Sequence, residues 1–199
     1  MTELEECERV AVESDLALRD DLLAAAPEAA RELYRRFAPR LLAFAASRFP
    51  ADRQLAEDVT VQSLANAARN IRGFDPRKST LTAWLYGIAR RQIRDEVRSR
   101  TRQKSVPADA LSPLDEATGI PSDDDIAASV AARIDAERLM AQLKSLLSDV
   151  EFEILVLSAI DRLSAREIGS VVGRSERAVH SLLHRARTKA RERLTTHGQ

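Results

Sequence analysis

Residues 163–194 have the pattern of a helix-turn-helix, which constrains the fold more than any other stretch of the chain. Ser164 and Glu167 have the spacing of a capping box, so a helix is predicted to follow directly. Gly173 suits the left-handed position that ends a helix, and Ser175 suits the cap of the next one. The short segment between these residues therefore predicts two helices joined by a tight turn.

The second of these helices has one apolar face and one basic face. Its apolar side chains recur at steps of three and four residues, which predicts a stripe about 100° wide that faces a core. The stripe consists of Val179, Leu182, Leu183, Ala186, Ala190 and Leu194. Between Arg174 and Arg193 there are seven Lys or Arg against two acids, whereas the whole chain balances 31 against 31. A merely solvated helix face mixes both signs, so this excess favours contact with nucleic-acid phosphates.

Composition predicts a helical protein of the cytoplasm. The 199 residues are 44% hydrophobic, which is enough for one large or two small cores, and only 4% aromatic, which favours helices over sheets. Cys7 is the single cysteine, so no disulfide framework is expected. The acidic N-terminus lacks a signal-peptide pattern, and no stretch approaches the roughly 18 apolar residues of a membrane span. We therefore expect a cytoplasmic location and no membrane insertion.

The charges are arranged in blocks that divide the chain. Residues 90–104 hold seven basic residues against two acids and form a second basic arm. Residues 105–132 contain six acids among Pro and Gly but no Lys or Arg, which predicts a flexible acidic linker. The expected organisation is an acidic N-terminal extension at 1–15, a helical domain at 16–104, the linker at 105–125 and a helix-turn-helix domain at 126–195.

Periodicity and capping residues predict the remaining helices. In the first domain they are expected at Leu16–Ala25, from Pro27 to about Phe49, at Asp52–Ile71 closed by Gly73, and from Ser79 or Thr80 through the arginines. In the second domain they are expected at about Ile126–Leu147 and at Asp149–Ile160, which the capping box of Ser148 and Glu151 opens. No strand pattern is present. The predicted fold class is all-α, with two small helical domains joined by the acidic linker.

Three separated stretches resemble the extracytoplasmic-function (group 4) sigma factors of bacterial RNA polymerase. They are LYRRFAPRLLAF at 33–44, AEDVT at 56–60 with FDPRKSTLTAWLYGIAR at 74–90, and LSAREIGSVVGRSERAVHSLLHRAR at 163–187. They look like conserved regions 2.1, 2.2 to 2.4, and 4.2. The resemblance implies an alternative sigma factor that binds core RNA polymerase, at its β′ clamp and β flap, and recognises the −10 and −35 elements of promoter DNA. Its implied regulators are an anti-sigma factor or a Ser/Thr kinase.

The resemblance and the helix geometry together predict which side chains of the second domain meet the −35 element. The N-terminal part of a recognition helix faces base edges in the major groove, and the neighbouring basic residues lie nearer to phosphates. The predicted base readers are Arg177, His180, Ser181 and His184. The predicted phosphate contacts are Arg174, Arg185, Arg187 and Lys189.

The first domain is predicted to recognise the −10 element, where promoter opening requires bases to be unstacked and held. The loop of Arg77, Lys78, Ser79 and Thr80 is expected to capture a flipped base. Tyr86, Arg90, Arg91 and Arg94 are expected to follow the strand or its duplex edge. Trp84 could stack on a base, but its apolar neighbours favour a place in the core.

A third surface is predicted to bind core polymerase. The family contacts the clamp through the outward face of region 2.2, which here consists of Asp58, Val61, Gln62, Ala65 and Arg69. The usual run after Asp-Val-Thr is Gln followed by an acid, whereas Val61 and Gln62 stand in those places. Because one carboxylate is lost, we expect conditional activity. Phosphorylation of Thr60 or Ser63 would restore negative charge, although the helical wheel turns both toward the core, and an apolar contact through Val61 is the alternative.

Other functional classes fit the sequence less well. The chain has no Gly-rich phosphate loop and no nucleophile paired with a base, so neither an enzyme nor a cofactor is expected. His180 and His184 have the spacing of a helical metal pair, but no further Cys or His lies nearby, so no metal site is expected. Two rivals remain. One is a sigma-like mimic or decoy that binds a regulator or polymerase without initiating, and the other is a helix-turn-helix repressor.

Overall fold

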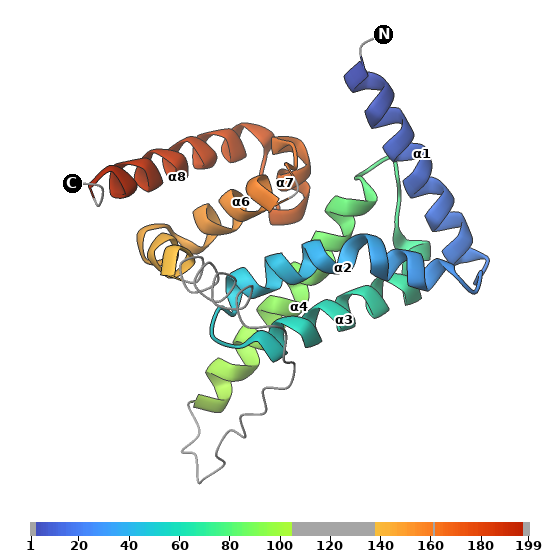
Figure 1. Ribbon diagram of the computed structural model, residues 1–199, viewed down its shortest axis with the longest axis horizontal. Helices are drawn as coiled ribbons and strands as arrows, with labels where there is room; N and C mark the ends of the chain where they lie inside the picture. The colour runs from blue at the N-terminus through green and yellow to red at the C-terminus, as the bar shows by residue number, and fades with distance from the viewer. Residues whose placement is uncertain (1–2, 105–137, 161, 197–199) are drawn as a thin grey trace, which may run out of the picture.

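The computed structural model describes residues 3–104, 138–160 and 162–196, and within these ranges it contains helices and no strand (Figure 1). The first unit consists of α1 (Glu3–Leu23), α2 (Ala29–Arg48), α3 (Arg53–Arg69), the short 3-10 helix η1 (Ile71–Gly73) and α4 (Leu81–Lys104). The second unit consists of a helical segment at 138–146, α6 (Asp149–Ile160), α7 (Ala165–Val172) and α8 (Glu176–Thr196). The expected all-α class is confirmed. The predicted linker at 105–125 and the predicted helix start at Ile126 lie outside the described residues.

The helix-turn-helix forms as its local sequence predicts. Ser164 and Glu167 make both hydrogen bonds of a capping box at the start of α7. Gly173 ends that helix in the left-handed conformation, with φ of 70°. Gly169 permits the tight turn, because a Cβ at this position would lie 2.6 Å from the carbonyl oxygen of Arg174. A side chain here would force the backbone of the turn apart.

Side-chain caps also fix the starts of α3, α4, α6 and α8. The hydroxyl of Ser175 accepts a backbone N–H at the start of α8, and Ser148 and Glu151 bond each other's backbone N–H groups at the start of α6. At α3 the carboxylate of Asp52 accepts a backbone N–H at 3.0 Å, and at α4 the hydroxyl of Thr80 accepts one at 3.3 Å. These bonds satisfy amides that a helix leaves without an internal partner, so each helix start is encoded locally.

The first helix differs most from the sequence expectation. α1 begins at Glu3 rather than near Leu16, so residues predicted as an N-terminal extension are helical. A tertiary contact explains part of the extra length of α1, because Asp15 is buried and pairs with Arg36 of α2. Leu18 is buried one turn further along. Sequence periodicity alone does not reveal such a partner on another helix.

Other helix ends shift by a few residues. α2 begins at Ala29, since Pro27 lies in the turn before the helix rather than in its first turn. α3 ends at Arg69 rather than Ile71, because the chain tightens there into η1. Gly73 therefore closes the 3-10 turn and not α3 itself.

Each unit has its own hydrophobic core, and the two cores pack together into one. In the first unit the rings of Phe44 and Tyr86 meet edge to face, with their centroids 5.2 Å apart. In the second unit Phe152, Ile168 and Val179 are almost completely buried among α6, α7 and α8. Packing of α7 on α4 and of α6 on α2 merges both centres into one continuous cluster of buried residues. Figure 1 shows α6, α7 and α8 gathered on one side of the first unit.

Within the second unit, Glu151 connects the start of α6 to α8. Its side chain is buried, and its two oxygens lie 3.1 and 2.9 Å from the ammonium of Lys189. The pKa of Glu151 is held at about 2, below its ordinary 4.5, chiefly because the Ser148 N–H donates to it and also because Lys189 does. The charged carboxylate is therefore preferred in the folded state.

This preference makes the stability of the second unit depend on pH. Because the folded pKa of Glu151 is lowered, its contribution is fully present above the ordinary pKa of 4.5 and is lost as the pH falls toward 2. Glu151→Gln keeps a side chain that can complete the capping box but removes the charge. In urea unfolding, the variant should have a much lower free energy of unfolding than wild type at about pH 7, and a smaller deficit at about pH 3. A difference that is equal at both values would contradict this role.

Candidate nucleic-acid interface

The recognition surface on α8 has the exposure that the sequence predicts. All eight residues assigned to −35 contact are exposed: Arg174, Arg177, His180, Ser181, His184, Arg185, Arg187 and Lys189. On the opposite side Val179, Leu183 and Ala186 are buried against α6 and α7. Burial of the apolar stripe thus fixes the orientation of the basic side chains. The roles of the individual residues in binding remain predictions.

Four of these residues have partners within the protein that sequence reasoning did not reveal, and the first is His180, whose Nε2 lies 3.9 Å from Oε1 of Glu176. The ammonium of Lys189 is held by the buried carboxylate of Glu151, so a phosphate would have to compete for it. Arg187 donates to the hydroxyl of Ser158 at 3.2 Å. The hydroxyl of Ser181 donates to the backbone carbonyl oxygen of Arg177, as polar side chains in helices often do. Arg177 and His184 are the most directly presented of the predicted base readers.

The loop before α4 presents two cations around one carboxylate. Asp75 accepts hydrogen bonds from the backbone N–H of Arg77 at 3.1 Å and from its guanidinium at 3.0 and 3.1 Å. Lys78 lies 3.7 Å from the same carboxylate. The guanidinium of Arg77 holds the pKa of Asp75 at about 2, below the ordinary 3.8. Both cations are exposed, but each is partly neutralised until another anion replaces Asp75.

A pocket of about 350 Å³ opens beside this loop. Lys78 and Ser79 line one part of it, and Trp84 lines another. Trp84 is half-buried and its ring lies 5.5 Å from that of Phe74, at an angle of 45°. The sequence predicted a core position for Trp84, and the ring does pack against the core while also bordering this pocket. Ser170, from α7 of the second unit, completes the lining.

The prediction that Tyr86 follows a DNA strand is wrong for this conformation. Tyr86 is 1% exposed and packs against Phe44 in the centre of the first unit. Along α4, Ala89 and Ile93 are buried on the same stripe. The helical repeat of 3.6 residues explains the error, because Tyr86 lies three and seven residues before these two core positions.

The arginines of α4 divide into two groups. Arg91 and Arg94 are exposed and, with Gly87, Asp95 and Arg98, line a mainly basic hollow of about 310 Å³. Arg90 also reaches this hollow but donates from Nε to Glu153 of the second unit, at 2.7 Å. The side chains of this ion pair are 20% and 9% exposed. Arg90 is therefore not presented to solvent in the way that the sequence prediction assumed.

All five residues of the predicted polymerase-binding face on α3 are exposed: Asp58, Val61, Gln62, Ala65 and Arg69. The side chain of Val61 is half exposed. Gln62 accepts a hydrogen bond from the side chain of Gln92 of α4 at 2.7 Å, so it also ties α3 to α4. The face thus offers the carboxylate of Asp58, the apolar side chains of Val61 and Ala65, the amide of Gln62 and the guanidinium of Arg69.

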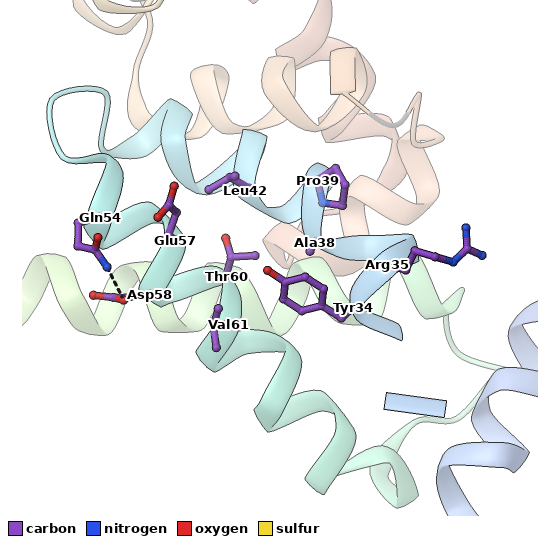
Figure 2. A pocket seen from close by; sticks show the side chains of 10 residues that line it. All are labelled: Tyr34, Arg35, Ala38, Pro39, Leu42, Gln54, Glu57, Asp58, Thr60 and Val61. Carbon is purple, nitrogen blue, oxygen red and sulfur yellow. Dashed lines mark hydrogen bonds between the residues drawn. The ribbon is translucent and has the colours of Figure 1, made fainter. Parts of the chain in front are cut away.

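A groove between α2 and α3 extends this face beyond what the sequence analysis identified. It holds about 510 Å³, and Figure 2 shows the side chains that line it. From α2 come Tyr34, Arg35, Ala38, Pro39 and Leu42, and from α3 come Gln54, Glu57, Asp58, Thr60 and Val61. Tyr34 is 52% exposed, like Val61 on the other wall. A helical wheel of the 33–44 stretch would have placed Tyr34 outside the core, since Leu33 and Phe37 face inward.

The two candidate phosphorylation sites are buried, as the wheel indicated. Thr60 is 3% exposed, and its hydroxyl donates to the carbonyl oxygen of Ala56 at 2.7 Å. Ser63 is 1% exposed, and its hydroxyl donates to the carbonyl oxygen of Val59 at 2.6 Å. A phosphate at either position would need α3 to shift, because a buried dianion without a cationic partner is strongly unfavourable.

The described residues form neither a metal site nor a membrane-spanning helix. No group of three or more His, Cys, Asp or Glu side chains in 3–104, 138–160 and 162–196 comes together as a metal site would require. No helix in the same ranges is long and apolar enough to cross a membrane.

Family models match both units. The model for sigma-70 region 2 matches residues 33–103, and the model for sigma-70 region 4 matches residues 137–189. The RNA polymerase sigma factor CnrH of Cupriavidus metallidurans is 33% identical over 150 residues, which cover 74% of this chain and 78% of CnrH. The sigma factor EcfG of Rhodopseudomonas palustris is 29% identical over 174 residues, covering 87% and 82% of the two chains. For SigD of Mycobacterium tuberculosis the values are 27% over 143 residues, and the match spans 72% of this chain and 65% of SigD.

Two solved structures share the fold. CnrH in complex with the cytosolic domain of CnrY superposes with a TM-score of 0.67 and 24% identity, over 92% of this chain and 99% of that one. RpoE of Bartonella quintana, in complex with the anti-sigma factor NepR, gives a TM-score of 0.61 and 22% identity, over 85% and 99%. At these identities the structures establish the shared arrangement of helices.

Proposed function

This chain belongs to the sigma-70 family of RNA polymerase sigma factors, and we propose that it is an extracytoplasmic-function (group 4) member that recognises −10 and −35 promoter elements. One observation carries the proposal: the chain combines region 2 with region 4, and each unit has its own basic surface. A repressor with only a helix-turn-helix would lack the first unit. A mimic of a sigma factor would not need both basic surfaces.

Recognition of the −35 element rests on α8. A helix of this kind enters the major groove with its N-terminal part against base edges. Arg177 and His184 are exposed there, with His180 between them, and carry the sequence preference. Arg174, Arg185 and Arg187 bind phosphates and set the register of the helix. Because some of these residues contact bases and others contact phosphates, substitutions in the two groups should change DNA binding differently.

Recognition of the −10 element rests on the loop and pocket before α4. Single-stranded bases are held by stacking on aromatic rings and by cations that follow the backbone. Trp84 offers the ring and Lys78 the adjacent cation, in a pocket lined by both. Arg91 and Arg94 lie along the continuation of this surface and follow the strand. Tyr86 supports the core and takes no part in binding.

Binding of core polymerase rests on the α3 face and the groove beside it. A partner helix with an apolar side chain and a basic neighbour would fit between Tyr34 and Val61 and reach Asp58. The polymerase clamp is the proposed partner here, and the β flap that of the second unit. Because Gln62 replaces an acid, docking is weaker than in the usual family pattern and activity is conditional. An anti-sigma factor, such as the one bound to the solved RpoE, or a kinase acting at Thr60 or Ser63, is the proposed regulator.

The division between base and phosphate contacts is tested with the polymerase-bound protein. Arg177→Ala should reduce discrimination among −35 sequences by roughly 1–3 kcal/mol, because a lost base contact affects only some sequences. Arg187→Ala should weaken binding to every sequence alike. The measurement is the affinity of the complex for a panel of −35 variants. Uniform loss in both mutants would show that Arg177 contacts only phosphate.

The altered α3 face is tested by restoring its acid. Gln62→Glu retains an oxygen that accepts from Gln92, so the fold should persist while core affinity rises by about 0.2–1 kcal/mol, as for an exposed ion pair. Titration of core polymerase with labelled protein measures this effect. Gln142→Glu adds the same charge at an exposed position of the second unit and serves as the control. If wild type already binds as tightly as Gln62→Glu, and Val61→Gln weakens binding, the apolar contact is the correct account.

A further inference from the structure

A buried carboxylate of α1 lies where the loop of residues 77–80 enters α4. Asp15, which carries it, is 9% exposed. One Nη of Arg36 on α2 donates to this carboxylate, and the other donates to the hydroxyl of Ser14 at 3.1 Å. The backbone N–H of Leu81, the first residue of α4, donates to the carboxylate as well. Asp15 therefore connects α1 and α2 to the start of α4.

The start of α4 has two caps of different origin. A helix leaves its first backbone N–H groups without an internal partner. The hydroxyl of Thr80 accepts the N–H of Ala83 at 3.3 Å, which is a local cap. Asp15 accepts the N–H of Leu81 from another helix, and its negative charge lies at the positive end of the helix dipole. The local cap starts the helix, whereas the tertiary cap fixes where that start lies relative to α1 and α2.

The loop of residues 77–80 is anchored on both sides. Phe74 before it is buried, and Leu81 after it is completely buried. Figure 1 shows the segment between η1 and α4 running beside α1, which also packs on η1. Between these anchors the side chains of Arg77 and Lys78 are exposed. The positions of these two cations thus depend on the anchors at either end, and α1 supplies one of them.

The anchor depends on the acceptor oxygens of Asp15 more than on its charge. Burial raises the pKa of Asp15 above its ordinary 3.8, although Arg36, the N–H of Leu81 and Arg40 favour the charged form. Because burial disfavours the carboxylate here, a neutral side chain of the same shape should be tolerated. Asparagine keeps an acceptor oxygen, and alanine keeps none. The two substitutions therefore separate loss of the charge from loss of the hydrogen bonds.

We propose that Asp15 is a positioning residue for −10 recognition, which holds the start of α4 and so places the 77–80 loop and the pocket beside Trp84. This inference rests on the proposed function of that loop. Asp15 is buried and acts through the loop rather than by touching DNA. Recognition of a base requires the contacting groups to be held within about 0.5 Å of their productive geometry. Loss of the anchor should therefore weaken −10 preference while leaving −35 preference unchanged.

The anchor itself is tested without DNA through the fluorescence of Trp84, the single tryptophan of the chain. Acrylamide quenching reports how far solvent reaches this ring beside the loop. Asp15→Ala should raise the quenching constant, whereas Asp15→Asn should stay close to wild type. Asp21→Ala makes the same kind of change at an exposed position of α1 and is the matched control. If Asp15→Ala does not fold, Arg36→Gln releases the carboxylate and should raise the constant to a smaller extent.

The role in recognition is tested with the full chain bound to core polymerase. One promoter found by run-off transcription is made into two libraries, randomised either at the −10 or at the −35 element. Asp15→Ala should reduce discrimination among −10 sequences roughly tenfold, the order of one lost base contact, and leave discrimination among −35 sequences unchanged. Asp15→Asn and Asp21→Ala should retain both preferences.

Each part of the proposal has its own contradicting result. Unchanged quenching in Asp15→Ala and Arg36→Gln would overturn the anchor, and unchanged −10 preference in Asp15→Ala would overturn its role in recognition. An equal loss in Asp15→Asn, or an equal loss at −10 and −35, would also overturn the proposal. If wild type itself shows no −10 preference, the proposed function of the loop fails, while quenching still tests the anchor.

Discussion

The burial of one face of α4 determines most of the functional geometry of this protein. Tyr86 packs edge to face on Phe44, and Ala89 and Ile93 continue the same buried stripe. Because a helix can turn only one such stripe to the core, the rotation of α4 about its axis is fixed. Arg91 and Arg94 must then face solvent, and Arg90 lies between the two units. The buried stripe of α4 therefore orients the basic residues of the proposed −10 surface.

The net charge of zero conceals a spatial division of the ionic groups. In the second unit Glu151 and Glu153 are buried, and each holds a cation from another helix. Removing one partner of such a pair leaves a buried charge, which costs more than an exposed pair gains. On α8, Arg177 and Arg185 face outward. These two buried acids thus stabilise the packing, whereas exposed cations form the basic surface of α8.

The sequence predicted the helix-turn-helix in detail, because the residues that start and end its helices act over short distances in the chain. The capping box of Ser164 and Glu167 and the left-handed Gly173 act within a few residues, so neither needs knowledge of the rest of the fold. The outward residues of α3 follow from periodicity for the same reason. The groove wall at Tyr34 was accessible to this reasoning as well, and a wheel applied to α2 would have found it.

The errors concern tertiary partners, which no local pattern encodes. Tyr86 has a polar group and stands four residues before Arg90 in the sequence, yet packing against Phe44 buries it. Arg90 differs from Arg91 only by the rotation of one residue on the helix, and that rotation brings it to Glu153. Glu167 was predicted as a cap and is one, but its second oxygen also accepts from Thr80 of the other unit. The local sequence does not predict this second hydrogen bond, because its donor, Thr80, lies in the other unit.

The central claim is that this chain gives core RNA polymerase the ability to start transcription at particular promoters. The most direct measurement is run-off transcription on fragmented genomic DNA with purified core polymerase, with and without the full chain. The account predicts discrete transcripts that require both components and that share a −10 and a −35 sequence upstream of their start sites. Binding to core without any new transcript would contradict it and identify a mimic. Tight, sequence-specific DNA binding by the chain alone would identify a repressor instead.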